Sequence, residues 1–194
     1  MVSEQIRTFI AIELTNEVKY GLNRLQTQLK SEQYTFVKWV APGGIHMTLK
    51  FLGNVHPEKV SKVTKVVEQA VAGVSAFKVV VKDVGGFPNL KQPRVLWVGI
   101  GGDIQKLIDL QQRIDNDLMP LGFAKEKRSF TPHLTLARLR EGVSAQDRQE
   151  FGAKIEAMAP KLFYEMVVGS INVMKSQLLS TGAIYSRLSE LKLH

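Results

Sequence analysis

The amino-acid sequence predicts an α+β fold with two largely antiparallel sheets. Short runs of β-branched and apolar residues are interspersed with segments whose apolar residues recur at helical spacing, without the regular strand–helix–strand alternation of a parallel sheet. A weak internal repeat indicates two related halves, because residues 45–52 and 132–139 share four identical positions in eight. The 194 residues suffice for one domain, or for two small lobes that share a core.

Local patterns place each element in turn. We expect strands rich in β-branched and apolar residues at residues 6–14, 36–40, 46–53, 77–84, 94–100, 129–139, 164–174 and 184–188. Amphipathic stretches predict four helices, which begin at Thr15 or Asn16, Pro57, Asp103 and Ser144. Residues 85–93, which are rich in glycine and proline, are expected to form a loop.

Composition narrows the class of protein. The chain contains no cysteine, which excludes disulfides, thiolate metal sites and a cysteine nucleophile. The first residues do not resemble a signal peptide, and no apolar run approaches the roughly 18 residues that span a bilayer. We therefore expect a soluble, cytoplasmic protein that does not bind a membrane. The net charge of +8 and a pI near 9.7 favour a nucleic-acid partner, although a lysine-rich solvated surface gives the same balance.

Each repeated segment carries a His-x-Thr-Leu motif, residues 46–49 and 133–136. Side chains alternate along a strand, so the histidine and threonine of a motif should share one face while the leucine lies on the other. If the two strands meet across a cleft, one imidazole can accept a proton from water while the other gives one to a leaving oxygen. Thr48 and Thr135 can donate hydrogen bonds to phosphate oxygens. The duplicated motif therefore predicts a phosphodiester-hydrolysing site built around His46 and His133.

Two other interpretations of the motif histidines remain open. They can be half-buried sheet residues with hydrogen-bonded partners, or they can be zinc ligands. A stable zinc site needs a third or fourth ligand, and no His-x-x-x-His pair or carboxylate at ligand spacing accompanies either motif. We therefore expect chemistry without a metal or another cofactor.

The same alternation predicts the direction in which the side chains beside the motifs point. Lys50 should share the face of His46, either at the rim of the cleft or in solvent, whereas Phe51 should face the core. On a regular strand Arg138 points away from His133. It reaches a bound phosphate only where the strand ends or bulges first, and is otherwise a surface arginine.

A local basic cluster precedes the second motif. It consists of Lys125, Lys127 and Arg128, of which Arg128 is a candidate phosphate-binding residue, because a guanidinium can donate two parallel hydrogen bonds to phosphate oxygens. Phe87 and Trp97 are aromatic residues that can stack on bases, but we expect them in the core.

At these residues the sequence resembles the two-histidine phosphoesterase superfamily, and in particular its RNA 2',3'-cyclic phosphodiesterase branch, formerly named 2'-5' RNA ligase. The segments that resemble this branch extend nearly from end to end: residues 6–12, 45–53, 93–99 and 130–138. The resemblance implies a single bilobal phosphoesterase domain over residues 1–194. In it, two pseudo-symmetric lobes would have antiparallel sheets that face a central cleft, with helices outside.

The resemblance also implies an enzyme that opens a 2',3'-cyclic phosphate at an RNA 3' end and leaves a 2'-phosphate. By motif position, His46 would be the proton donor and His133 the proton acceptor, with Thr48, Thr135 and Arg138 binding the phosphate. The expected substrates are RNA with cyclic phosphate ends, such as tRNA fragments, or cyclic nucleotides, and we expect a monomer. Two alternatives stay open: reversible 2'-5' RNA ligation by the same groups, and a non-catalytic RNA-binding module.

Overall fold

The computed structural model describes residues 5–30, 33–158, 162–179 and 182–193. Within these ranges the chain forms four α-helices, two 3₁₀ helices and nine strands. The strands are β1 Ile6–Glu13, β2 Val37–Trp39, β3 His46–Val55, β4 Phe77–Phe87, β5 Val95–Gly102, β6 His133–Leu139, β7 Phe163–Val168, β8 Ser170–Leu179 and β9 Gly182–Lys192. The helices are α1 Asn16–Leu29, η1 Pro42–Gly44, α2 Pro57–Val71, α3 Ile104–Asp117, η2 Met119–Leu121 and α4 Ala145–Met158.

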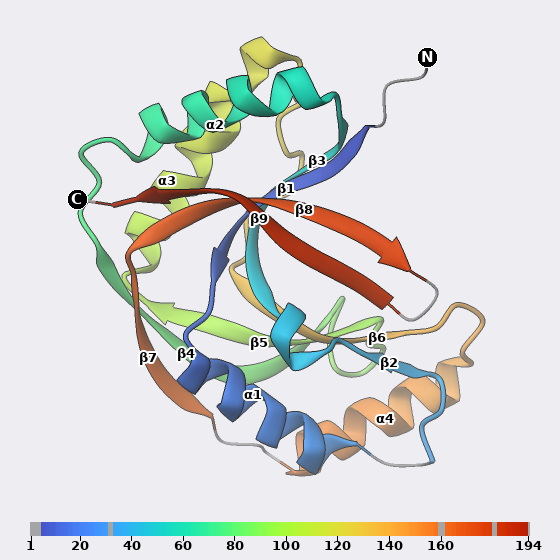
Figure 1. Ribbon diagram of the computed structural model, residues 1–194. Helices are drawn as coiled ribbons and strands as arrows, with labels where there is room; N and C mark the ends of the chain where they lie inside the picture. Colours follow the sequence, from blue (N-terminus) through green and yellow to red (C-terminus); the bar gives the residue numbers. More distant parts are fainter. Residues whose placement is uncertain (1–4, 31–32, 159–161, 180–181, 194) are drawn as a thin grey trace.

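The strands form two antiparallel sheets, which confirms the predicted α+β fold. Sheet A has the strand order β3–β1–β8–β9, and sheet B has the order β2–β6–β5–β4–β7. In Figure 1, α2 and α3 lie on the outer side of sheet A, while α1 and α4 lie on the outer side of sheet B. The first histidine motif is therefore on β3 of sheet A, and the second is on β6 of sheet B.

The two halves of the chain follow a similar path and exchange helices. The order β1, α1, β3 in the first half corresponds to β5, α3, β6 in the second. α1 follows a strand of sheet A but packs against sheet B at β7, and α3 follows a strand of sheet B but packs against sheet A at β3. As a result, apolar residues from both halves form one main hydrophobic core. No helix in the described ranges is both long and apolar enough to span a membrane.

The helix starts follow the predicted signals with one exception. Thr15 accepts a backbone N–H of the first turn of α1 at 3.4 Å. Ser144 accepts the backbone N–H of Asp147 at 3.0 Å, which is the first bond of the predicted capping box. Its hydroxyl also donates to the carboxylate of Asp147 at 2.7 Å. Asp103 was expected to cap α3, but its carboxylate instead accepts the backbone N–H of Lys78 at 3.4 Å.

Several strand boundaries differ from the expected ones. The second motif strand β6 begins at His133 rather than at residue 129, and β9 extends over Gly182–Lys192 rather than over residues 184–188. β4 continues to Phe87 through residues that were expected to form a loop, because the glycine at position 85 leaves room for the ring of Trp97. A Cβ on Gly85 would lie 2.3 Å from that ring. The expected strand at residues 164–174 is divided at Gly169, so that β7 belongs to sheet B and β8 to sheet A.

The strand β3 contains a β-bulge within the first motif. Thr48 lies opposite Ala11 of β1, and Lys50 lies opposite the preceding residue, Ile10. Leu49 is therefore the extra residue. A bulge of this kind reverses the alternation of side chains beyond it.

The strand β6 has a bulge at the same place in the second motif. Thr135 lies opposite Trp97 of β5, and Ala137 lies opposite Leu96, so Leu136 is the extra residue. The two motifs therefore share their local backbone irregularity as well as their residues.

Two buried glutamines bind the carbonyl groups of the bulged leucines. Gln26 of α1 donates from Nε2 to the carbonyl oxygens of Leu136, at 3.0 Å, and Val40, at 2.8 Å. Gln111 of α3 donates from Nε2 to the carbonyl oxygen of Leu49 at 3.3 Å. Each helix thus contacts the motif strand that belongs to the other half of the chain.

Candidate active site

The imidazole of His46 is enclosed by aromatic rings on sheet A. It stacks on Phe9 with ring centroids 4.6 Å apart, and the ring of Tyr185 meets it edge-on at 4.8 Å. Phe9 is buried in a small hydrophobic cluster with Ala11 and Met174 that is separate from the main core. These contacts fix the orientation of the half-buried imidazole.

The imidazole of His133 has a comparable environment on sheet B. The ring of Phe87 meets it edge-on, with centroids 4.9 Å apart and planes at 89°. Trp97 packs beside Phe87 at 5.3 Å, so a second aromatic pair supports the second histidine.

Both histidines make the same backbone hydrogen bond. Nδ1 of His46 lies 2.8 Å from the carbonyl oxygen of Gly44, and Nδ1 of His133 lies 2.7 Å from that of Thr131. Because a carbonyl oxygen only accepts, Nδ1 is the protonated nitrogen of each ring. Nε2 can then accept a proton when the ring is neutral, or donate one when the ring is charged.

The two motif strands lie against each other, although they belong to different sheets. Along each strand, the histidine and threonine are half-buried while the residue between them is buried, as the alternation predicts. The structure thus places His46 and Thr48 on one face of β3, and His133 and Thr135 on one face of β6.

Burial lowers the pKa of both imidazoles below its usual value of 6.5. Loss of hydration is the largest cause, and the backbone hydrogen bond of each ring opposes it. The neighbouring charges differ between the two histidines. Glu13 raises the pKa of His46 while Lys19 lowers it, whereas Arg138 lowers the pKa of His133.

The bulge at Leu136 turns Arg138 toward the face of His133. Arg138 lies opposite Val95, and Val95 shares a face of β5 with Trp97, which lies opposite Thr135. The sequence predicted that Arg138 would reach the phosphate site only if the strand ended or bulged before it, and the structure has such a bulge. The charge of Arg138 accordingly acts on the imidazole.

Arg128 occupies a different place from Arg138. It is exposed and lines a pocket together with Lys125, Lys127 and Phe51. The predicted basic cluster is thus gathered at this pocket.

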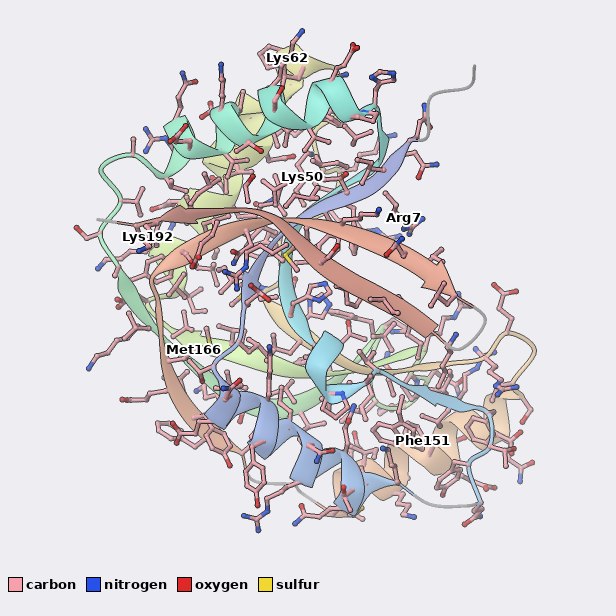
Figure 2. The ribbon with its side chains drawn as sticks, viewed as in Figure 1. Arg7, Lys50, Lys62, Phe151, Met166 and Lys192 are labelled. Atoms are coloured by element: carbon pink, nitrogen blue, oxygen red, sulfur yellow. The ribbon has the colours of Figure 1, made fainter. Side chains whose placement is uncertain are left out.

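Two expectations for residues beside the first motif were wrong, because the bulge at Leu49 reverses their direction. Lys50 is neither at a cleft rim nor in solvent: it is buried, and its Nζ forms an ion pair with Asp115 of α3. Figure 2 shows Lys50 in the interior, whereas Lys62 points outward from α2. Phe51 lies on the side of Phe9, with ring centroids 5.9 Å apart, and is 57% exposed.

The expectation that Phe87 and Trp97 lie in the core was also wrong. Among the described residues, the main hydrophobic core includes neither of them, and both are half-buried beside His133. Glycines explain this placement. Added Cβ atoms on Gly85 and Gly99 would lie 2.3 and 3.3 Å from the indole, so these positions give the ring its space.

Sequence reasoning missed three residues around His46. Phe9 and Glu13 lie two residues on either side of Ala11 on β1, so strand alternation was an available signal for their common face. Tyr185 comes from β9, and no local pattern links it to the first motif.

The chain is similar to known proteins over nearly its whole length. Residues 16–177 match the family model of the 2'-5' RNA ligase superfamily. Proteins named RNA 2',3'-cyclic phosphodiesterase are 30% identical in Methanothermobacter thermautotrophicus, over 97% of this chain and 100% of that protein, and in Thermotoga maritima, over 95% and 94%. The crystal structure of E. coli LigT complexed with 3'-AMP has the same fold, with a TM-score of 0.78 and 23% identity over 98% of this chain and 99% of that one.

Proposed function

The chain belongs to the 2'-5' RNA ligase superfamily, and we infer that it is an RNA 2',3'-cyclic phosphodiesterase. The relatives that carry this name match this chain over nearly its whole length. In the proposed reaction, water opens the cyclic phosphate at an RNA 3' end. The products are a 2'-phosphate and a free 3' hydroxyl.

The observation that carries this proposal is the matched environment of the two histidines. His46 and His133 each hold Nδ1 against a backbone carbonyl two residues earlier and each keep Nε2 for proton transfer. They lie on two strands that contact each other from different sheets. Displacement at phosphorus requires one base and one acid on opposite sides of the phosphate, which two such imidazoles can supply.

We assign the acid to His46 and the base to His133. The charge of Glu13 favours the protonated form of His46, as an acid needs, whereas the charge of Lys19 opposes it. The charge of Arg138 favours the neutral form of His133, as a base needs. Burial lowers the pKa of both imidazoles, but the opposite charges of Glu13 and Arg138 support this assignment of acid and base.

Each proton has a defined path in the proposed mechanism. His133 accepts a proton from water at Nε2 while the water oxygen bonds to phosphorus. The bond between phosphorus and the 3' oxygen breaks, and His46 donates a proton from its Nε2 to that oxygen. We propose that the hydroxyls of Thr48 and Thr135, with the guanidinium of Arg138, bind the non-bridging phosphate oxygens as their charge increases.

The first test is hydrolysis of an oligonucleotide with a 2',3'-cyclic phosphate end, in the presence and absence of EDTA. We expect equal rates under both conditions, and phosphorus NMR of the product should show a 2'-phosphate rather than a 3'-phosphate. Loss of activity in EDTA would overturn the metal-independent mechanism. A 3'-phosphate product would overturn the assignment of the leaving oxygen.

A second candidate reaction, 2'-5' RNA ligation, is favoured by the name of the family itself. In this reaction an RNA 5' hydroxyl replaces water, gives its proton to His133 and forms a 2'-5' phosphodiester, while His46 again protonates the 3' oxygen. Product analysis with an excess of 5'-hydroxyl RNA separates the two outcomes. RNA binding without either product would indicate a non-catalytic module.

A further inference from the structure

A pocket of about 610 Å³ opens beside the first motif strand and has no role in the reaction described above. Its walls are Phe51 and Leu52 of β3 and residues 122–128, which follow η2. This combination joins one exposed aromatic ring to a basic segment.

The ring of Phe51 connects the pocket to the histidine site. Phe51 packs against Phe9 with ring centroids 5.9 Å apart, and Phe9 stacks on His46 at 4.6 Å. The bulge at Leu49 produces this continuity, because on a regular strand Phe51 would point to the other face. The ring of Phe51 is 57% exposed and is separated from the His46 imidazole by the ring of Phe9, so it is available for stacking with a base.

The opposite wall of the pocket carries a positive charge. Lys125, Lys127 and Arg128 are all exposed, and Glu126 is the one acidic residue among the described lining residues. Three cations against one carboxylate attract a polyanion, and phosphate groups are suited to such flexible basic side chains.

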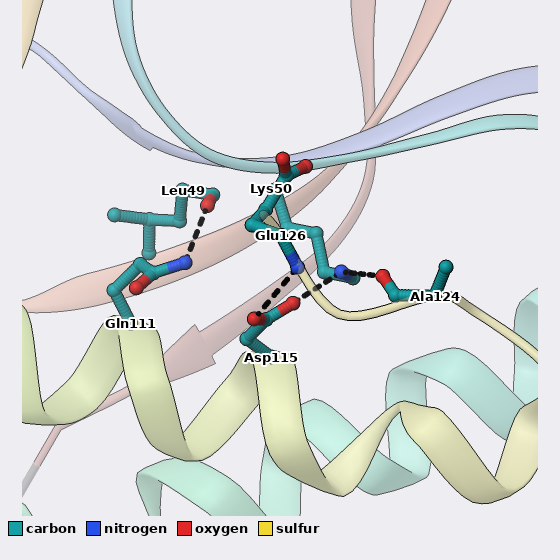
Figure 3. A network of polar contacts seen from close by, with 6 residues as sticks. All are labelled: Leu49, Lys50, Gln111, Asp115, Ala124 and Glu126. Carbon is teal, nitrogen blue, oxygen red and sulfur yellow. Dashed lines mark hydrogen bonds and ion pairs between the residues drawn. The ribbon is translucent and has the colours of Figure 1, made fainter. Parts of the chain in front are cut away.

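A buried polar network holds this wall in place. Figure 3 shows Lys50 donating to the carbonyl oxygen of Ala124 at 2.8 Å, while Asp115 accepts the backbone N–H of Glu126 at 3.1 Å. Lys50 and Asp115 also pair with each other. The backbone of the basic wall is therefore attached to β3 and α3. Its cationic side chains are exposed and form no ion pair with any residue that the structure describes.

We propose that this pocket binds the nucleotide on the 5' side of the terminal cyclic-phosphate nucleotide, with its base on Phe51 and its phosphate at Lys125, Lys127 and Arg128. This inference rests on the proposed function and adds to it a preference for RNA strands over mononucleotides. A nucleoside 2',3'-cyclic phosphate occupies only the histidine site. A longer strand also occupies the pocket.

The test measures kcat/KM for two substrates, a nucleoside 2',3'-cyclic phosphate and a short oligonucleotide with the same terminal nucleotide. The readout is kcat/KM for the oligonucleotide divided by kcat/KM for the nucleoside 2',3'-cyclic phosphate. Phe51→Ala should lower this ratio about 5- to 150-fold, the range expected for the loss of one base-stacking interaction, whereas Phe51→Trp should keep it. Phe163→Ala, which removes a ring that is 66% exposed on β7, is the matched control and should not change the ratio.

The charged wall is tested with the double variant Lys125→Gln/Lys127→Gln. It should lower the ratio most at low salt, and it should weaken the dependence of oligonucleotide binding on salt. The control Lys65→Gln/Lys106→Gln removes the same charge from exposed lysines of α2 and α3 and should leave the ratio unchanged.

An unchanged ratio in Phe51→Ala and in the lysine variant would overturn the proposal. If the wild-type protein hydrolyses neither substrate, the proposed function fails instead. Fluorescence anisotropy with a labelled 3'-phosphorylated oligonucleotide then still tests the pocket. Phe51→Ala must weaken that binding relative to Phe163→Ala, and equal affinities would overturn the pocket as an RNA site.

Discussion

Gln26 of α1 donates a hydrogen bond from Nε2 to the carbonyl oxygen of Leu136, 3.0 Å away, at the bulge of β6. The same amide donates to the carbonyl oxygen of Val40 at 2.8 Å, and the backbone N–H of Val40 donates to Leu136 at 2.9 Å. One buried side chain therefore joins a helix, the end of β2 and the second motif strand. The bulge that turns Arg138 toward His133 is stabilised from this helix.

Replacing Gln26 should destabilise the protein, because the substitution leaves buried carbonyl groups with fewer donors. We expect Gln26→Leu to lower the free energy of unfolding by about 1–3 kcal/mol. Gln28→Leu makes the same chemical change at an exposed position of α1 and should shift it by no more than about 0.5 kcal/mol. Urea unfolding curves measure both, and equal stabilities for the two variants would contradict a structural role for Gln26.

Breaking the ion pair between Lys50 and Asp115 should be costlier. Lys50→Met leaves the carboxylate of Asp115 buried without its cation, so we expect the free energy of unfolding to fall by about 3–5 kcal/mol. Lys50→Met/Asp115→Leu removes both charges and should recover most of this loss. Urea unfolding again provides the measurement.

An exposed lysine provides the control for this pair. Lys106 lies 3.5 Å from Asp103 in an exposed ion pair, so Lys106→Met should change the free energy of unfolding by less than about 1 kcal/mol. If the Lys50→Met/Asp115→Leu protein is as unstable as Lys50→Met alone, an unpaired charge is not the cause.

The pH dependence of hydrolysis follows from the lowered pKa of both histidines. The reaction requires one neutral and one protonated imidazole, and burial lowers the pKa of each below 6.5 in the free enzyme. As pH rises above both pKa values, the acid loses its proton and kcat/KM falls. We therefore expect a bell-shaped profile of kcat/KM with its maximum below pH 6.5. A maximum above pH 7 would contradict the described environments.

Removing the charge of Arg138 or of Glu13 should shift the pKa of the neighbouring histidine, in opposite directions for the two variants. Arg138→Gln removes a positive charge and should raise the pKa of His133, whereas Glu13→Gln removes a negative charge and should lower the pKa of His46. NMR titration of the imidazole C–H resonances measures each pKa separately. Arg128→Gln is the control for the arginine. A His133 pKa that shifts equally in both arginine variants would show that Arg138 has no specific influence.

The features that depend on a local pattern could be predicted from the sequence. The fold class, the helix starts at Thr15 and Ser144, and the shared faces of the motif histidines and threonines all follow from spacing along single elements. These features need no knowledge of which strands pair.

The features that depend on strand pairing could not be predicted. The bulges at Leu49 and Leu136 arise from the register of the motif strands against β1 and β5, and both motifs read as regular alternation in the sequence. The directions of Lys50, Phe51 and Arg138 all depend on these bulges. The polar network around Lys50 likewise forms because α3 follows a strand of sheet B but packs against β3 of sheet A. Local sequence patterns do not contain this tertiary relationship.

In the proposed mechanism His46 and His133 carry out the two proton transfers, and their alanine variants test these roles most directly. On an oligonucleotide with a cyclic phosphate end, His46→Ala and His133→Ala should each lower kcat by roughly 10²–10⁴-fold while the affinity for 3'-phosphorylated RNA is retained. His56→Ala, which changes a histidine outside both motifs at the start of α2, should keep the wild-type rate. A wild-type rate in either motif variant would contradict the account.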